Sequence, residues 1–162
     1  MIILIIIILL FIILSIIWYL VVRDVDVETF PENDNQMVLK FGHKYLQAGP
    51  NKSLVLGHNR RLATFLVVDS RDYRDCVQFE SVEYPGYLIC YHQGRWRLQS
   101  QYYVSHSRKT VFIPLGIKRQ KKRLGFVNLH NRYCIAVKGP RVIAQEYHSY
   151  PKKNQLFTFV RL

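Results

Sequence analysis

Apolar and polar positions divide the chain into two parts. Residues 1–22 are apolar throughout except for Ser15, so this stretch has no polar face. From residue 37 onward, short apolar and alternating runs such as 37–41, 87–92 and 110–113 are separated by turns rich in Gly, Pro and Asn. Such runs joined by short turns are typical of β-strands and hairpins. No long helical period follows residue 22, and the pattern predicts an all-β domain behind an N-terminal helix.

The β-type segments recur three times along the domain. Three tyrosines stand 42 and 46 residues apart, and an apolar residue follows each one at nine and at eleven positions. A phenylalanine follows each tyrosine some 20 to 25 residues later. The aligned positions are Tyr45, Tyr87 and Tyr133; Leu54, Trp96 and Val142; Leu56, Leu98 and Ala144; and Phe65, Phe112 and Phe157. One unit of four short strands cannot bury its own apolar face, whereas three units around a pseudo-threefold axis can. The repeats, at about 37–75, 76–124 and 125–162, therefore predict a β-trefoil.

The apolar stretch 1–22 predicts a transmembrane anchor. A helix of this length spans about 33 Å, enough for a bilayer core. A cleaved signal peptide is the first alternative, but the stretch has no basic start and no small-x-small cleavage site. A buried core helix would need an amphipathic pattern. Trp18 and Tyr19 followed by Arg23 instead resemble an interfacial belt and a charged stop.

Residues 23–36 predict an acidic tether without regular structure, because Pro31 and the Asn33–Asn35 segment discourage it. Few basic residues flank the anchor, and we expect the domain to lie outside the cytosol, as in a signal-anchored protein. The sequon at Asn51 is compatible with that orientation and predicts a glycosylation site in a hairpin turn.

Charge is concentrated in the domain. The chain holds 23 basic and 11 acidic residues, and the tether takes five of the acids and one arginine. Residues 37–162 therefore carry 22 basic and 6 acidic side chains, a net charge of +16. The densest run, which we expect to form an anion- or partner-binding loop, is Lys118, Arg119, Lys121, Lys122 and Arg123. Its ligand would be a heparin-like glycan, phospholipid head groups or an acidic subunit. The alternative is a solvated loop whose charges only raise solubility. Nucleic acid is disfavoured, because the run contains no aromatic residue for base stacking.

The sequence shows no pattern typical of catalysis, of a metal site or of a cofactor. The six histidines are scattered without metal-ligand spacing, and neither HExxH nor GxSxG occurs. Cys76, Cys90 and Cys134 are too few for a disulfide framework and lack zinc spacing. In an oxidising compartment one pair and one leftover thiol remain an alternative, while Cys90 in its apolar run is typical of a buried small hydrophobe.

The segment VQFESVEYPGYLI, residues 77–89, resembles the repeat of the AbfB module, the arabinose-binding β-trefoil attached to fungal and bacterial arabinofuranosidases. Phe79, Ser81 and Pro85–Leu88 match its pattern, with one residue lost before Tyr87. Ala63–Phe65 and Phe112–Gly116 match the end of its repeat unit. In that family an Arg-His pair after Tyr-Leu helps to form each sugar pocket. Here the corresponding residues are Gln47–Ala48, Ile89–Cys90 and Ile135–Ala136, so the resemblance implies the fold without the arabinose pockets.

Two weaker resemblances concern other functions. The Phe-Glu-Ser…Pro-Gly run resembles the interleukin-1 signature, and fibroblast-growth-factor-like trefoils use basic loops for heparan sulfate. By layout, an isoleucine-rich anchor, a short tether and a compact ectodomain resemble small envelope proteins of baculovirus-like viruses, including the per os infectivity factors. These resemblances leave three hypotheses: a subunit of a membrane or virion-envelope complex, a glycan- or glycosaminoglycan-binding module, and a growth-factor or cytokine-like ligand.

Exposed aromatic and arginine side chains are the candidates for a protein interface. We expect Trp96 to be a core residue, because Leu54 and Val142 occupy the same repeat position. Strand alternation then places the neighbouring arginines on the solvent side. The interface candidates are Arg95, Arg97, Tyr102, Tyr103, Tyr147 and Tyr150. The sequence thus predicts a non-enzymatic, membrane-anchored β-trefoil whose partners are the bilayer and other membrane proteins, with a polyanionic glycan as the alternative.

Overall fold

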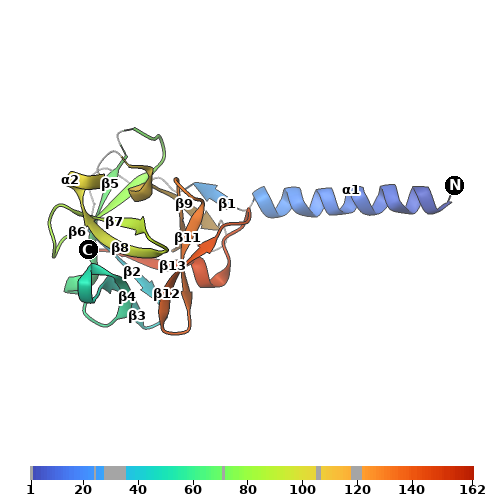
Figure 1. Cartoon of the computed structure of the whole chain (residues 1–162). Coiled ribbons are helices and arrows are strands. Elements are labelled where there is room, and N and C mark those ends of the chain that lie inside the picture. Colours follow the sequence, from blue (N-terminus) through green and yellow to red (C-terminus); the bar gives the residue numbers. More distant parts are fainter. Residues whose placement is uncertain (1, 24, 28–35, 71, 105–106, 118–121) are drawn as a thin grey trace.

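The computed structural model describes residues 2–23, 25–27, 36–70, 72–104, 107–117 and 122–162. Helix α1 (Ile2–Arg23) projects from one side of a β-domain, as Figure 1 shows. Strand β1 (Val25–Val27) follows and pairs antiparallel with β9 (Phe112–Ile117) through Val25↔Ile117. The prediction that the tether has no regular structure is therefore wrong for Val25–Val27, which add a strand to the sheet. Residues 28–35 lie outside the described residues.

Each repeat supplies four strands. The first holds β2 (Gln36–Phe41), β3 (Lys44–Ala48), β4 (Leu54–Gly57) and β5 (Thr64–Asp69). The second holds β6 (Val77–Ser81), β7 (Tyr87–His92), β8 (Arg95–Ser100) and β9. The third holds β10 (Arg123–Asn128), β11 (Tyr133–Lys138), β12 (Arg141–Glu146) and β13 (Phe157–Arg161).

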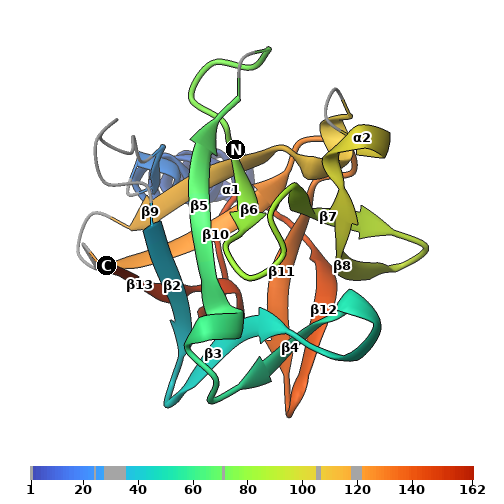
Figure 2. The same ribbon diagram turned by 90° about the vertical axis from the view of Figure 1, so that its left-hand side faces the viewer.

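The outer strands of the three repeats close into a six-stranded barrel. Strand β2 pairs with β5, β5 with β6, β6 with β9, β9 with β10, β10 with β13, and β13 again with β2. The inner strands form three hairpins, β3–β4, β7–β8 and β11–β12. Strands β4, β8 and β12 contact one another, so the hairpins meet and cap one end of the barrel. Figure 2 shows the first and third hairpins together at the lower edge of the domain.

The barrel core obeys the predicted threefold repeat. Phe65, Phe112 and Phe157 pair with Met37, Val77 and Leu124, which begin the equivalent stretch of β2, β6 and β10. All six side chains are buried in one cluster. A 3₁₀ turn precedes each phenylalanine strand, at Arg61–Ala63, Arg108–Thr110 and Lys153–Gln155, and the last residue of each turn is buried. The barrel and its threefold core confirm the predicted β-trefoil fold.

The tyrosine alignment is wrong by one residue in the first repeat. Tyr45 pairs with Lys40, whereas Leu88 pairs with Glu80 and Cys134 with Val127, so Tyr45 is equivalent to Leu88 and Cys134. The turn of the first hairpin compensates. Five residues separate the paired Ala48 and Leu54, against four between Tyr91 and Trp96. The return strands therefore align as predicted.

The N-terminal helix exposes its apolar side chains. Side chains of α1 are described for residues 6–19, and the large hydrophobic ones are 48% to 73% exposed. The hydroxyl of Ser15 donates to the carbonyl oxygen of Phe11 at 2.8 Å and so finds its partner within the helix. Across the residues that the structure describes, no helix reaches the combination of length and apolar character needed to cross a membrane.

Candidate functional site

The positions that correspond to the arabinose pockets are filled with packed side chains. Ala48, Ile89, Cys90, Ile135 and Ala136 are all 0% or 1% exposed. The one polar member, Gln47, is half-buried, and its Oε1 already accepts a hydrogen bond from the Asn59 amide at 2.9 Å. Buried apolar side chains offer no hydrogen bond to a sugar hydroxyl, so these positions do not form polar sugar pockets. The site must therefore be sought elsewhere on the domain.

Two adjoining clefts lie where the three hairpins meet. The first, here called the Arg97 cleft, measures about 360 Å³ and is lined by Asn51, Ser53, His92, Gln93, Arg95, Trp96 and Arg97. The second, here called the axial cleft, measures about 590 Å³ and is lined by Ser53, Leu54, Gly94, Arg95, Trp96, Arg141, Val142, Ile143 and Ala144. Its lining includes the symmetry-equivalent Leu54, Trp96 and Val142, so it lies at the pseudo-threefold axis. The two clefts share Ser53, Arg95 and Trp96.

Trp96 forms the buried floor between the two clefts. It is 2% exposed, and its indole Nε1 donates to the carbonyl oxygen of Ile143 at 3.0 Å. Its ring packs at 5.1 Å from that of Tyr91 and 5.5 Å from that of Phe112. The prediction that Trp96 is a core residue is confirmed. The indole ties the second hairpin to the third, so it fixes the shape of both clefts.

Arg97 is the chemically unusual residue of the site. Its residue partner across the first–second hairpin contact is Ser53, through an isolated β-bridge. The guanidinium Nε of Arg97 is buried and has no hydrogen-bond partner among the described residues. The equivalent positions, one residue after Leu54 and Val142, hold Val55 and Ile143. An arginine thus stands where both other repeats place an aliphatic side chain.

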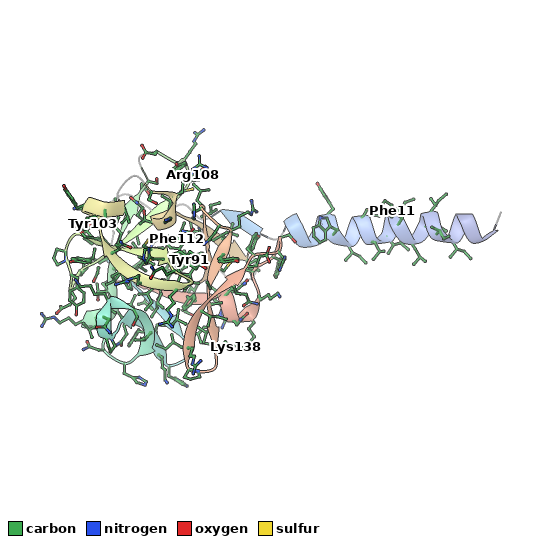
Figure 3. The ribbon with its side chains drawn as sticks, viewed as in Figure 1. Phe11, Tyr91, Tyr103, Arg108, Phe112 and Lys138 are labelled. Carbon is green, nitrogen blue, oxygen red and sulfur yellow. The ribbon has the colours of Figure 1, made fainter. Side chains whose placement is uncertain are left out.

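The surroundings of the clefts are basic. Arg95 and Arg141 are exposed, and neither lining set contains an aspartate or a glutamate. Lys52, next to Asn51 and Ser53, lies with its Nζ 3.7 Å from the ring centroid of Tyr87. Figure 3 labels Lys138, the last residue of β11 in the third hairpin, at the lower end of the domain and Arg108 at the upper end. The hairpin end therefore offers cationic groups to a ligand without a competing carboxylate in either cleft.

Most of the predicted basic loop cannot be placed. Lys118, Arg119 and Lys121 lie outside the described residues. Lys122 is exposed, and its carbonyl oxygen accepts a hydrogen bond from the Phe159 amide at 3.2 Å. Arg123 is half-buried at the start of β10, where it pairs with Thr158. Arg123 is therefore part of the barrel edge, and the anion-binding role of the run stays a prediction.

The interface candidates occupy different parts of the surface. Tyr102 and Tyr103, in the short helix α2 (Gln101–Val104), are 86% and 75% exposed, with ring centroids 5.2 Å apart. Tyr147 is half-buried against Leu115, Val127 and Cys134, and burial raises the pKa of its phenol. Tyr150 is also half-buried. Among the described residues, no contact joins Tyr102–Tyr103, the Tyr147 and Tyr150 side chains, and the two arginines Arg95 and Arg97 into one patch.

The sequon and the cysteines have defined environments. Asn51 is exposed in the left-handed region (φ 55°) and lines the Arg97 cleft, which sequence reasoning missed. Cys76, Cys90 and Cys134 are free and buried. Burial raises the pKa of Cys90 to about 11 and that of Cys134 to about 12. Cys90 thus packs as a small hydrophobe, as its apolar run indicates.

Comparison with known proteins supports the fold. A β-trefoil named BEL superimposes with a TM-score of 0.68 at 8% identity, over 85% of this chain and 99% of that one. A designed threefold-symmetric protein, ThreeFoil, gives 0.63 at 14% identity, over 78% and 99%. An arabinofuranosidase complexed with arabinofuranosyl-α-1,2-xylobiose gives 0.67 at 13% identity, over 83% and 32%.

These likenesses lie below 25% identity and show the fold alone. The chain spans about a third of the length of the arabinofuranosidase that it matches. No protein-family model matches the sequence, and no curated protein matches it. The domain is an all-β protein with β-trefoil neighbours.

Proposed function

We propose that this chain is a membrane-anchored, non-enzymatic binding subunit of a membrane complex. Helix α1 inserts into lipid, and the β-trefoil presents its surfaces to partner proteins outside the cytosol. The layout resemblance narrows the proposal to a virion-envelope complex that acts in entry. The observation that carries the proposal is the uncovered apolar surface of α1.

The described side chains of α1 support insertion in three ways. Large apolar side chains from Ile6 to Tyr19 are all about half exposed or more, on every side of the helix. A soluble protein rarely leaves so large an apolar surface uncovered. The one serine within this stretch, Ser15, has its hydroxyl satisfied by a backbone carbonyl, as a residue in lipid requires. Trp18 and Tyr19 stand near the domain end of the helix, as interfacial anchors do.

The pairing of β1 supports a domain held close to the lipid surface. Val25 pairs with Ile117 two residues after the helix ends at Arg23. Across the next strand Gly116 pairs with Leu124, so Lys122 and Arg123 approach the same end of the barrel. We propose that these two cations face the lipid head groups, where a basic side chain near an anionic surface gains about 1 kcal/mol.

A binding role fits the chemistry of the clefts. Their linings supply guanidinium, amide, hydroxyl and imidazole groups, all of which can form hydrogen bonds with a ligand. The exposed pair Tyr102–Tyr103 offers the kind of aromatic anchor that protein interfaces use. We therefore propose that α2 contacts a partner subunit.

The test is extraction of the full chain from membranes. We expect the protein to stay in the membrane pellet at alkaline pH and at high salt, and to enter solution with partner proteins only in detergent. A variant with Ile6, Leu9 and Ile13 changed to Lys should become extractable, because each buried charge costs about 2.5–3.5 kcal/mol at a helix centre. The matched control changes the same three residues to Val. Release of the unchanged chain by alkali or salt would refute the anchor.

The partner surface is tested separately. The double variant Tyr102→Ala, Tyr103→Ala should lose the co-purifying proteins while staying in the membrane. If the same partner proteins still co-purify with the double variant, the role proposed for α2 is refuted.

A further inference from the structure

We infer that the Arg97 cleft binds an acidic sugar unit of a glycan, with a sulfate or carboxylate group held by Arg97. This inference is independent of the membrane complex proposed above. It rests on the cleft, the unpaired guanidinium atom and the polar groups around them.

The first step is the unsatisfied Nε of Arg97. A buried N–H without an acceptor is costly, and native structures keep few of them. Among the described residues no carboxylate or carbonyl oxygen accepts from this atom, and Arg97 is one of the residues that line the cleft. Arg97 as a whole is only half-buried, so an anionic oxygen placed in the cleft would accept from its guanidinium group. Planar guanidinium groups hold sulfates and carboxylates through two parallel hydrogen bonds, which gives such a contact direction as well as strength.

The second step is the neutral polar lining. Asn51, Ser53 and Gln93 bring two amides and a hydroxyl to the same cleft, and each group both donates and accepts. Such groups suit sugar hydroxyls, which also donate and accept. The volume of about 360 Å³ lies at the lower end of the range for small-molecule sites and exceeds what a single inorganic anion would fill. Together, the lining and the size favour one acidic monosaccharide unit.

The third step separates a glycan from nucleic acid. Binding of single-stranded nucleic acid depends on aromatic faces on which bases stack. The one indole of the cleft, Trp96, is 2% exposed and holds its Nε1 on a backbone carbonyl, so its face is not available. An acidic glycan needs no stacking face.

The axial cleft extends the site. It shares Ser53, Arg95 and Trp96 with the Arg97 cleft and carries Arg141. A glycan chain that places one acidic unit at Arg97 can therefore run past Arg95 and bring a later acidic unit to Arg141. This arrangement predicts that Arg141 matters only for the longer chains.

The experiment uses the full chain in detergent micelles, produced in bacteria so that Asn51 is unmodified. The probes are heparin-derived disaccharide and hexasaccharide, their desulfated counterparts, and inorganic sulfate, titrated at about 150 mM salt, where long-range charge effects are screened. We expect Arg97→Gln to weaken binding of both sulfated probes about tenfold or more, and Arg97→Lys to restore part of the loss. Arg141→Gln should weaken only the hexasaccharide. Desulfated probes should bind at least tenfold more weakly.

The matched control is Arg108→Gln, which removes the same charge from an exposed residue that lines neither cleft. We expect it to change affinity by less than twofold. Equal losses from Arg97→Gln and Arg108→Gln would mean that only the overall positive field attracts the probe, and would overturn the inference. So would the absence of binding, or inorganic sulfate that binds as tightly as the disaccharide. A fourth contrary result is binding to phosphoinositide vesicles that depends on Arg97 as strongly as glycan binding does. Thermal unfolding of each variant checks that it is folded.

Discussion

The most informative substitution is Arg97→Ile, because it replaces the unpaired arginine with the residue that the third repeat carries at the same position. Ile143 in β12 and Val55 in β4 show that the equivalent positions of the other two repeats accept an aliphatic side chain. Isoleucine also suits a half-buried strand position. The change removes a buried donor that has no acceptor among the described residues. We therefore expect the substitution to stabilise the domain in the absence of ligand.

The magnitude follows from the cost of an unsatisfied buried donor, about 1–3 kcal/mol. Arg97 is only half-buried, so the rest of its guanidinium keeps some hydration and the gain should lie at the low end, about 1 kcal/mol. For a domain of this size that corresponds to a rise of roughly 3–6 °C in the unfolding midpoint. Arg108→Leu should have the opposite effect, since its Nε donates to the Tyr73 hydroxyl at 2.9 Å. A loss of about 0.5–1 kcal/mol is expected there.

The assay is urea and thermal unfolding of the full chain in micelles, with and without the sulfated hexasaccharide. At a hundredfold excess over its dissociation constant, the ligand should stabilise the unchanged protein by about 2.7 kcal/mol and Arg97→Ile by much less. The order of stability should therefore reverse when ligand is added. If Arg97→Ile unfolds more easily than the unchanged protein without ligand, the guanidinium is stabilising as it stands and the reasoning from its unpaired atom is refuted.

Three further predictions concern the core, the thiols and the sequon. Phe79→Ala should cost about 3–5 kcal/mol in urea unfolding, because Phe79 is fully buried with three phenylalanine rings at 4.9 to 6.5 Å, whereas Tyr102→Ala should stay within about 0.5 kcal/mol; similar losses would contradict the core assignment. Burial raises the pKa of Cys134 from 9.0 to about 12, so the folded state holds this proton while the unfolded chain releases it. The free energy of unfolding should then fall as pH rises from 9 toward 12, and Cys134→Ala should flatten that fall; parallel pH profiles would count against it. Asn51 should carry a glycan when the domain passes through a secretory pathway, and this glycan should block the Arg97 cleft, which Asn51 lines. Asn51→Gln, which keeps an amide at this place in the cleft, should remove the mass difference and restore most of the hexasaccharide binding. Normal binding by the glycosylated chain would refute the predicted block of the cleft.

The threefold core could be predicted from sequence because burial constrains it. Phe65, Phe112 and Phe157 occupy one symmetric place in the barrel and are fully buried, so each repeat must supply a large apolar side chain there. Tyr45 is different. It lies half-exposed near the start of β3, where a shift of one residue leaves no cavity and exposes no core residue. The longer turn before Leu54 then restores the alignment, and spacing alone cannot reveal two compensating changes.

The clefts could not be predicted, because their lining comes from three hairpins that are distant in sequence. Ser53, Arg95 and Arg141 meet only when β4, β8 and β12 converge on the axis. The basic run 118–123 is visible in the sequence because its charges are contiguous. Residues that only folding brings together, such as Ser53, Arg95 and Arg141, form no pattern along the chain. The strand β1 was missed for a similar reason. Three residues in an acidic segment carry little strand signal, and their pairing partner lies some 90 residues away.

One signal of the site was nevertheless present in the repeats. The position after Leu54, Trp96 and Val142 reads Val, Arg, Ile. All three residues are half-buried, and a threefold fold should favour an aliphatic residue at each of these equivalent positions. Natural sequences break such local rules mainly where function compensates for the lost stability. The barrel keeps its symmetry in Phe65, Phe112 and Phe157, and the departure from symmetry falls on the hairpin cap, where Arg97 opens onto a cleft. In a repeat protein, the position at which one repeat departs from the other two in charge is therefore a better guide to a binding site than the density of charge along the chain.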